Sequence, residues 1–157
     1  MAAKTDPLEL AKYGVLIAGI YLVYKVFKGT GLIPSATDTQ AADLNTKIDF
    51  KEYTKPDFYK KPAPAGYEAP LFTQAATNQK ITEIYDSTGF FNDCEDCIIG
   101  TLKSLTYKTQ YSWLADNFFK KYKKDMTSFI KASFNEKELY PAWTHIEALP
   151  TYRKKTK

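Results

Sequence analysis

The sequence predicts an all-α protein made of an N-terminal transmembrane helix, an extended proline-rich linker and a small five-helix bundle. Three observations lead to this prediction: an apolar run near the N-terminus, a concentration of prolines in the middle, and helical spacing of apolar residues in the second half. The predicted boundaries are residues 1–28 for the anchor, 29–72 for the linker, 73–150 for the bundle and 151–157 for a basic tail.

Composition narrows the classes of protein before any motif is considered. The chain has 157 residues, of which 44% are hydrophobic and 15% aromatic, and such values exclude a wholly disordered chain. Its 2 cysteines are too few for a disulfide-rich mini-protein. The formal net charge of +4 is too mild to indicate a dedicated nucleic-acid binder.

The N-terminal segment is predicted to cross a membrane once. The apolar stretch from Leu8 to Phe27 spans roughly one hydrocarbon thickness as a helix, because Lys12 and Lys25 can extend their ammonium groups toward the headgroups. Lysines flank both ends, so the positive-inside rule gives no orientation. The residues expected in the bilayer and at its interfaces are Tyr13, Leu16, Ile17, Ile20, Tyr21, Val23 and Tyr24.

Two other interpretations of this segment remain open. A helix buried in a core or docked on a partner would also be apolar, although three lysines interrupt this one. A cleaved signal peptide is disfavoured because Asp6 and Glu9 stand where a basic leader belongs.

The middle segment is predicted to be extended. Five of the 8 prolines fall between residues 29 and 72, and they favour extended or polyproline-II backbone. Such a linker could reach on the order of 130 Å. Four aromatic residues alternate with lysines there and could lie along a partner surface, the alternative being a solvated tether. These expected linker contacts are Tyr53, Phe58, Tyr59 and Tyr67.

Capping signals divide the second half into five helices. The first is expected to end at Gly89, and Asn92 with Glu95 forms an N-cap pair for the second. The third begins near Thr109 and Asp125 caps the fourth. No segment shows the alternation of a strand.

The fifth helix has a capping pair and one irregularity. Asn135 and Glu138 repeat the pattern of an N-cap residue followed three positions later by an acid. Pro141 either kinks this helix or occupies its first turn.

The run DCEDCIIGTL at Asp93–Leu102 and the following LADNFFKKYKKDMTSFI resemble parts of one annexin repeat. The resemblance covers residues 75–149, about half of the chain, and implies a five-helix fold with calcium-dependent binding to anionic phospholipid. The loop GFFND keeps only Gly89 of the glycine-rich calcium loop, and no carboxylate stands at Ser133–Phe134. Calcium needs six to eight oxygen ligands, so we expect no calcium site, no other metal and no cofactor.

Cys94 and Cys97 form a CxxC pair, for which three interpretations are weighed. A single pair supplies at most two zinc ligands, and the only histidine, His145, lies far along the chain. A redox or disulfide pair is the second interpretation; it favours a preceding strand and a setting that stabilises a thiolate, whereas Asp93, Glu95 and Asp96 oppose a thiolate here. The favoured interpretation is structural, with Cys97 buried and Cys94 beside the cap, and His145 is likewise expected on a helix flank.

Lysine clusters are the best binding candidates in the sequence. They comprise Lys120, Lys121, Lys123 and Lys124 in the bundle, and Arg153, Lys154 and Lys155 in the tail. They could meet an acidic protein surface, anionic lipid or nucleic acid, or simply complement a helix dipole at a solvated face. A single arginine argues against bidentate phosphate or base recognition, so nucleic acid is not favoured.

These features together favour a non-enzymatic, single-pass membrane protein that tethers a bilayer to a protein assembly. The layout resembles the small accessory membrane proteins of membrane-containing bacteriophages, which implies a virion internal membrane as its location. The alternatives are a peripheral module that contacts anionic lipid or nucleic acid through its lysines, and a thiol-redox protein using the CxxC pair.

Overall fold

A computed structural model describes residues 36–49, 51–89 and 92–156. The chain divides into two units, Met1–Thr39 and Gln40–Lys157, and nearly all described residues belong to the second. Within the described ranges, no helix is both long enough and apolar enough to cross a membrane. The predicted anchor, with Tyr13, Leu16, Ile17, Ile20, Tyr21, Val23 and Tyr24, lies outside the described residues.

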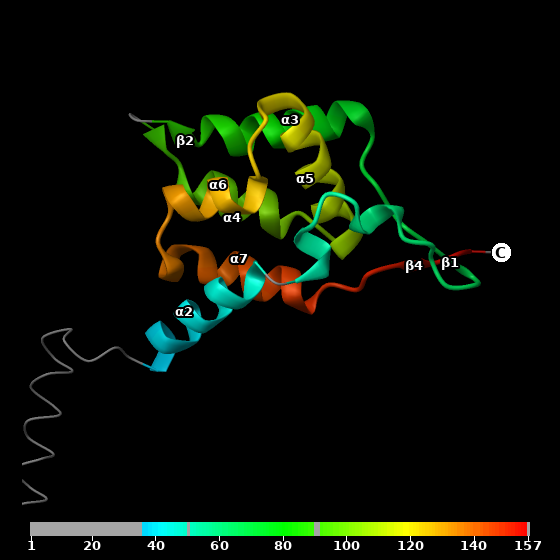
Figure 1. Ribbon diagram of the computed structural model, residues 1–157, viewed down its shortest axis with the longest axis horizontal. Helices are drawn as coiled ribbons and strands as arrows, with labels where there is room; N and C mark the ends of the chain where they lie inside the picture. The colour runs from blue at the N-terminus through cyan, green and yellow to red at the C-terminus, as the bar shows by residue number, and fades with distance from the viewer. Residues whose placement is uncertain (1–35, 50, 90–91, 157) are drawn as a thin grey trace, which may run out of the picture. The chain divides into compact units, whose positions relative to one another are not determined.

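Helices predominate among the described residues, which confirms the all-α prediction at that level (Figure 1). The α-helices are α2 (Ala36–Ile48), α3 (Gln74–Asp86), α4 (Glu95–Lys103), α5 (Lys108–Tyr122), α6 (Met126–Ser133) and α7 (Glu136–Ala148). Two 3-10 helices, η1 (Glu52–Thr54) and η2 (Phe58–Lys60), lie between α2 and α3. Four two-residue strands are also present: β1 (Tyr67–Glu68), β2 (Thr88–Gly89), β3 (Asn92–Asp93) and β4 (Arg153–Lys154).

The helices α3 to α7 occupy the region where the sequence predicts five helices. The expected caps of the last two are present: the Asp125 carboxylate accepts from Ser128 N–H at 2.7 Å, and Asn135 and Glu138 form a reciprocal capping box. Each pair satisfies backbone donors that the first helical turn leaves free. The starts of α6 and α7 therefore follow from local capping chemistry.

The start of α4 differs from the prediction. Asn92 does not cap the helix, because it belongs to the short hairpin of β2 and β3, in which Gly89 pairs with Asn92. Cys94 is the N-cap instead, and α3 already ends at Asp86. The absence of strands was also a wrong prediction, since two antiparallel pairs form. Two-residue strands are too short to give an alternating pattern in the sequence.

Pro141 lies inside α7 and not in its first turn. It is exposed, so the missing N–H faces the solvent side of the helix.

The prediction of an extended linker over residues 29–72 is wrong for residues 36–49 and 51–60, where the structure has α2, η1 and η2. Residues 61–72 contain no helix and include β1. Residues 36–48 form α2, whose buried face carries Ala41, Asn45 and Ile48 at helical spacing. The middle residue of that face is polar, so the apolar period is weak in the sequence. Asn45 tolerates burial because its Oδ1 accepts a 3.1 Å hydrogen bond from the Trp143 indole N–H.

Residues 51–61, here named the strap, contain both 3-10 helices and lie along α5. Ser112 Oγ donates to the Lys55 carbonyl at 2.6 Å and accepts from the Tyr59 N–H at 3.1 Å. Tyr53 is 5% exposed and meets Tyr111 edge to face, with ring centroids 6.2 Å apart. The strap is thus a fitted segment of the domain and not a free tether.

The hydrophobic core joins the strap and α2 to the five-helix region. Its largest fully buried side chains are Trp143, Tyr111 and Phe118, and it also includes Ile48 of α2 and Tyr53 of the strap. The folded unit therefore begins near residue 40 and not at residue 73. At the other end of the chain, β4 pairs with β1 and carries the C-terminal residues away from the helices (Figure 1).

Candidate binding surface

The C-terminal turn of α5 exposes one aromatic ring beside four lysines. Phe118 is fully buried while Phe119 is 50% exposed, because successive helical residues point about 100° apart. The lysines at 120, 121, 123 and 124 follow directly, and Lys123 ends the helix in the left-handed conformation with φ 56°. Phe119 and these four lysines are here named the basic surface.

Lys120 is the one lysine of the basic surface with an ion-pair partner in the described part of the chain. Its Nζ lies 2.6 Å from Asp116 Oδ2, one helical turn away. For Lys121, Lys123 and Lys124, no carboxylate of residues 36–49, 51–89 or 92–156 lies within ion-pair distance, and Lys121 Nζ instead donates to Thr82 Oγ1 at 2.8 Å. Three positive charges are therefore not neutralised by these parts of the chain.

A column of stacked rings supports two of these lysines. Tyr85 stacks on Tyr122 with centroids 4.0 Å apart and on Phe129 at 5.4 Å. Lys124 Nζ lies 5.3 Å from the Tyr85 centroid and 4.9 Å from that of Phe129, and Lys121 Nζ lies 4.9 Å from the Tyr122 centroid. Each such contact contributes about 0.5–1 kcal/mol at an exposed site. The rings therefore restrict where the ammonium groups lie.

Asp116 links the basic surface to the strap. Its Oδ2 accepts from Lys120 and, at 2.9 Å, from the hydroxyl of Tyr59. Burial by itself raises the pKa of the Asp116 carboxyl, but the two hydrogen bonds outweigh burial and hold the pKa below its ordinary value. Burial, together with the bond to Asp116, raises the pKa of Tyr59 to about 12. At neutral pH the pair is therefore a carboxylate and a neutral phenol.

The basic tail lies apart from the basic surface. Lys108 N–H, at the start of α5, bonds to the Pro150 carbonyl, so the tail leaves near the opposite end of that helix, roughly 20 Å from its lysines. Arg153 forms an ion pair with Glu68 across the β1–β4 ladder, whereas Lys154 and Lys155 are exposed. The structure therefore separates the two lysine clusters that the sequence suggests as binding candidates.

Of the four aromatic linker residues that could contact a partner, three pack against helices of the same chain. Tyr53 is buried in the core, Phe58 packs against it, and Tyr59 meets the Trp113 ring edge to face at 5.0 Å. Tyr67 is 42% exposed on β1. The surface along which most of these aromatics lie is thus α5 of the same protein.

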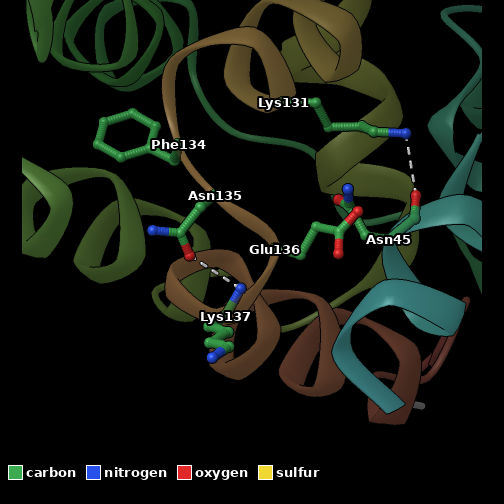
Figure 2. A pocket seen from close by; sticks show the side chains of 6 residues that line it. All are labelled: Asn45, Lys131, Phe134, Asn135, Glu136 and Lys137. Atoms are coloured by element: carbon green, nitrogen blue, oxygen red, sulfur yellow. Dashed lines mark hydrogen bonds between the residues drawn. The ribbon is translucent and has the colours of Figure 1, made fainter. Parts of the chain in front are cut away.

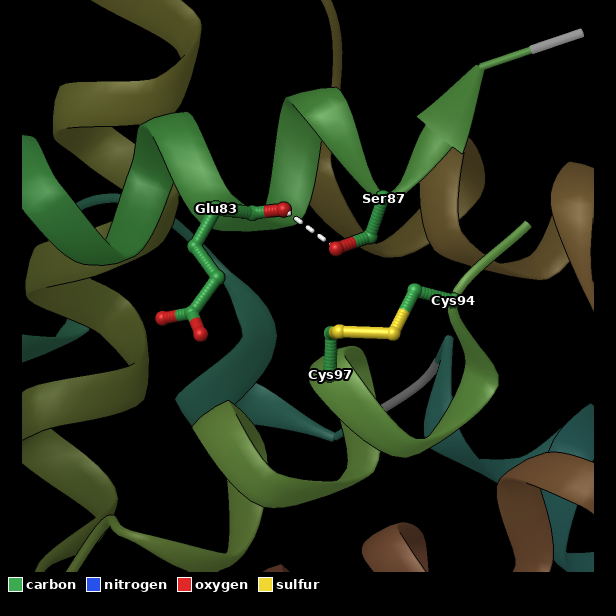
Figure 3. The surroundings of a disulfide bond; sticks show 4 residues. All are labelled: Glu83, Ser87, Cys94 and Cys97. Carbon is green, nitrogen blue, oxygen red and sulfur yellow. Dashed lines mark hydrogen bonds between the residues drawn. A yellow bond between two sulfur atoms is a disulfide. The ribbon is translucent and has the colours of Figure 1, made fainter. Parts of the chain in front are cut away.

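The CxxC residues form a disulfide at the start of α4 (Figure 3). Cys97 is partly exposed and not buried as expected, and Cys94 is at the cap as expected. His145 lies on α7 with its Nε2 2.9 Å from the Leu105 carbonyl oxygen, on the helix flank where it was expected. Within the described ranges, no three His, Cys, Asp or Glu side chains gather as metal ligands would.

A cavity of about 580 Å³ opens beside Asn45 of α2, Lys131 of α6 and the first turn of α7 (Figure 2). Lys131 Nζ donates to the Asn45 carbonyl at 2.9 Å and also pairs with Asp49. Asn135 accepts from Lys137 N–H as the cap of α7. These polar groups bridge helices or cap them, so the cavity suggests no ligand.

The sequence reasoning did not single out Asp116, although its i, i+4 spacing to Lys120 could have indicated it. Phe119 is evident from the sequence as a neighbour of the lysines, and its exposure follows from its position next to a core residue in the same helix. The stacking of Tyr85 on Phe129 joins residues 44 positions apart, and nothing local predicts it. Comparisons with protein families, curated proteins and solved structures find no match to this chain.

Proposed function

We propose that this protein is a non-enzymatic, single-pass membrane-anchored structural protein that tethers a bilayer to a protein assembly such as a virion shell. The apolar segment from Leu8 to Phe27 would hold the chain in the bilayer. The folded unit would dock on an acidic protein through the basic surface. The observation that carries this proposal is the presence of three lysines without a carboxylate partner in the described chain, next to the exposed Phe119.

The folded linker shortens the tether in this proposal. Because α2 begins at Ala36, only residues 29–35 separate the expected anchor from helical structure. Seven residues span at most about 25 Å when fully extended, against on the order of 130 Å for an extended linker over residues 29–72. The segment available as a tether is therefore short.

Lysine chemistry favours an acidic protein over nucleic acid or phospholipid as the occupant. Phosphate is recognised best by the planar fork of arginine, and the only arginine, Arg153, is paired with Glu68. Protein interfaces also favour an aromatic side chain at their centre, a role that suits Phe119.

The experiment that tests the docking surface uses full-length protein in detergent micelles and a polyglutamate peptide as the probe. Reversing Lys121, Lys123 and Lys124 to Glu should weaken peptide binding by about tenfold or more, since each exposed pair contributes about 0.2–1 kcal/mol and reversal adds repulsion. The control reverses three exposed lysines elsewhere, Lys103, Lys154 and Lys155, and should retain most of the affinity.

Equal losses in the two triple variants would refute the assignment of the docking surface. Anionic vesicles or duplex DNA tested in the same titration identify the alternatives. If either binds the unmodified protein more tightly than polyglutamate and discriminates between the two variants, the surface belongs to a peripheral lipid or nucleic-acid module.

A further inference from the structure

The Cys94–Cys97 disulfide does not connect separate parts of the fold. The two cysteines are 3 positions apart and both belong to the first turn of α4. The entropy that a cross-link removes from the unfolded chain grows with the length of the closed loop, so this short loop gives little stabilisation. The hairpin that precedes α4 is already closed by the 3.1 Å bond from Cys94 N–H to the Ser87 carbonyl. The Cys94–Cys97 disulfide is therefore not needed to hold parts of the fold together.

The disulfide also leaves the start of α4 without a side-chain cap. Thr73, Asp125 and Asn135 each accept a backbone N–H at the start of α3, α6 and α7, whereas Cys94 makes no such bond at the start of α4. A thiolate on Cys94 would occupy the position of the missing acceptor. Thiolates at helix N-termini are stabilised by the free N–H groups and by the helix dipole.

Acidic neighbours oppose that thiolate, whereas the free N–H groups of the first turn favour it. Glu95 and Asp96 lie in the first turn of α4, and Glu83 of α3 lies beside the disulfide (Figure 3). Glu95 is half-buried, but Asp96 and Glu83 are exposed, so water and salt weaken the repulsion from these two carboxylates. Hydrogen bonds from the N-terminal turn act at contact distance, and they lower thiol pKa values by one to several units in other proteins.

We propose that Cys94 and Cys97 form a reversible dithiol–disulfide site that exchanges with a dithiol, and that Cys94 is its nucleophile. In the reducing direction a thiolate of the dithiol attacks Cys94 Sγ, and the Cys94–Cys97 bond breaks. The electron pair stays on Cys97 Sγ, which takes up a proton. The second thiolate of the dithiol then attacks the other sulfur of the same dithiol, which is bonded to Cys94 Sγ. The mixed disulfide breaks, and Cys94 is released as a thiolate. Two electrons pass to the protein, and the dithiol becomes a disulfide.

The first test equilibrates full-length protein in detergent with dithiothreitol redox buffers, without denaturant. Alkylation and mass spectrometry measure the reduced fraction, while far-UV circular dichroism follows the helices. The proposal expects complete, reversible reduction with an unchanged helical spectrum. Reduction that occurs only when the helices are lost would overturn it.

The second test assigns the nucleophile. Cys97→Ser leaves Cys94 as the only thiol, and Cys94→Ser leaves Cys97, so alkylation by iodoacetamide reports each sulfur separately. Near pH 6.5, Cys94 should react about three- to tenfold faster than Cys97, because the free N–H groups at the helix start favour the Cys94 thiolate. Equal rates, or a faster Cys97, would overturn the assignment. The site lies outside the basic surface, so its outcome is independent of the proposed docking.

Discussion

The hydroxyl of Tyr59 donates a 2.9 Å hydrogen bond to Oδ2 of Asp116, a residue 57 positions further along the chain. The same oxygen accepts the ammonium group of Lys120 at 2.6 Å. One carboxylate thus fastens the strap to α5 and orients the first lysine of the basic surface. The proline-rich segment and the proposed docking surface are therefore parts of one structural arrangement.

Removing the Tyr59 hydroxyl should loosen the strap. Tyr59→Phe deletes a hydrogen bond to a charged acceptor, and we expect a loss of about 1–2 kcal/mol in the free energy of unfolding, measured with urea. Tyr67→Phe is the matched control, because Tyr67 is 42% exposed on β1, and it should change stability by less than about 0.5 kcal/mol. Equal stability of the two variants would show that the strap is not held by this bond.

Acid should weaken the same contact. The pKa of Asp116 is lower in the folded state than in the unfolded chain, so its stabilising contribution is complete above the unfolded value and is lost as pH falls through the folded one. Asp116→Asn should therefore flatten the decline of stability below about pH 4. Asp57→Asn, an exposed carboxylate of the strap, is the control and should leave that decline nearly unchanged. An unaltered decline in Asp116→Asn would contradict the role of this carboxylate.

The position of the domain boundary can be tested by truncation. A chain beginning at residue 36 keeps α2 and the strap, and we expect a cooperative unfolding transition by circular dichroism. A chain beginning at residue 73 loses Ile48 and Tyr53 from the core and leaves the Trp143 indole without its acceptor. It should be several kcal/mol less stable. If both fragments unfold at the same denaturant concentration, residues 36–72 do not belong to the folded unit.

The buried bond between α2 and α7 should account for part of that difference. Asn45→Ala strands the indole N–H of Trp143 in the core, which costs about 1–3 kcal/mol. Thr46→Ala, on the exposed side of α2, should cost less than about 1 kcal/mol. Urea denaturation of both variants measures the difference, and an Asn45→Ala variant as stable as the parent would argue against α2 packing on α7.

Local chemistry predicted the helices after residue 73 and much less of what precedes them. The caps at Asp125 and Asn135 each depend on three or four consecutive residues, so the sequence alone locates the starts of α6 and α7. Helix α2 escaped prediction because its buried face includes Asn45, whose partner is 98 positions away. The strap was not predicted for a related reason: Pro56 indicates a break in any α-helix there, but contacts with Ser112 and Asp116, far along the chain, decide where the segment lies.

The sequence predicted the lysines of the candidate site but not how they are arranged on the surface. The lysines after Phe119 are evident from the sequence, but their separation from the tail depends on the path of the chain after α7. The disulfide is the alternative that the sequence disfavours for the CxxC pair, because the acids around the cysteines argue against a thiolate.

Alkaline carbonate extraction of membranes from cells that express the full-length chain tests the central proposal most directly. The unmodified protein should stay in the membrane pellet, as should Thr5→Lys with Thr30→Lys, which adds charge outside the apolar segment. Ile17→Lys with Ile20→Lys places two charges mid-span at about 2.5–3.5 kcal/mol each, and should release the protein into the supernatant. Release of the unmodified protein would contradict a membrane-anchored tether.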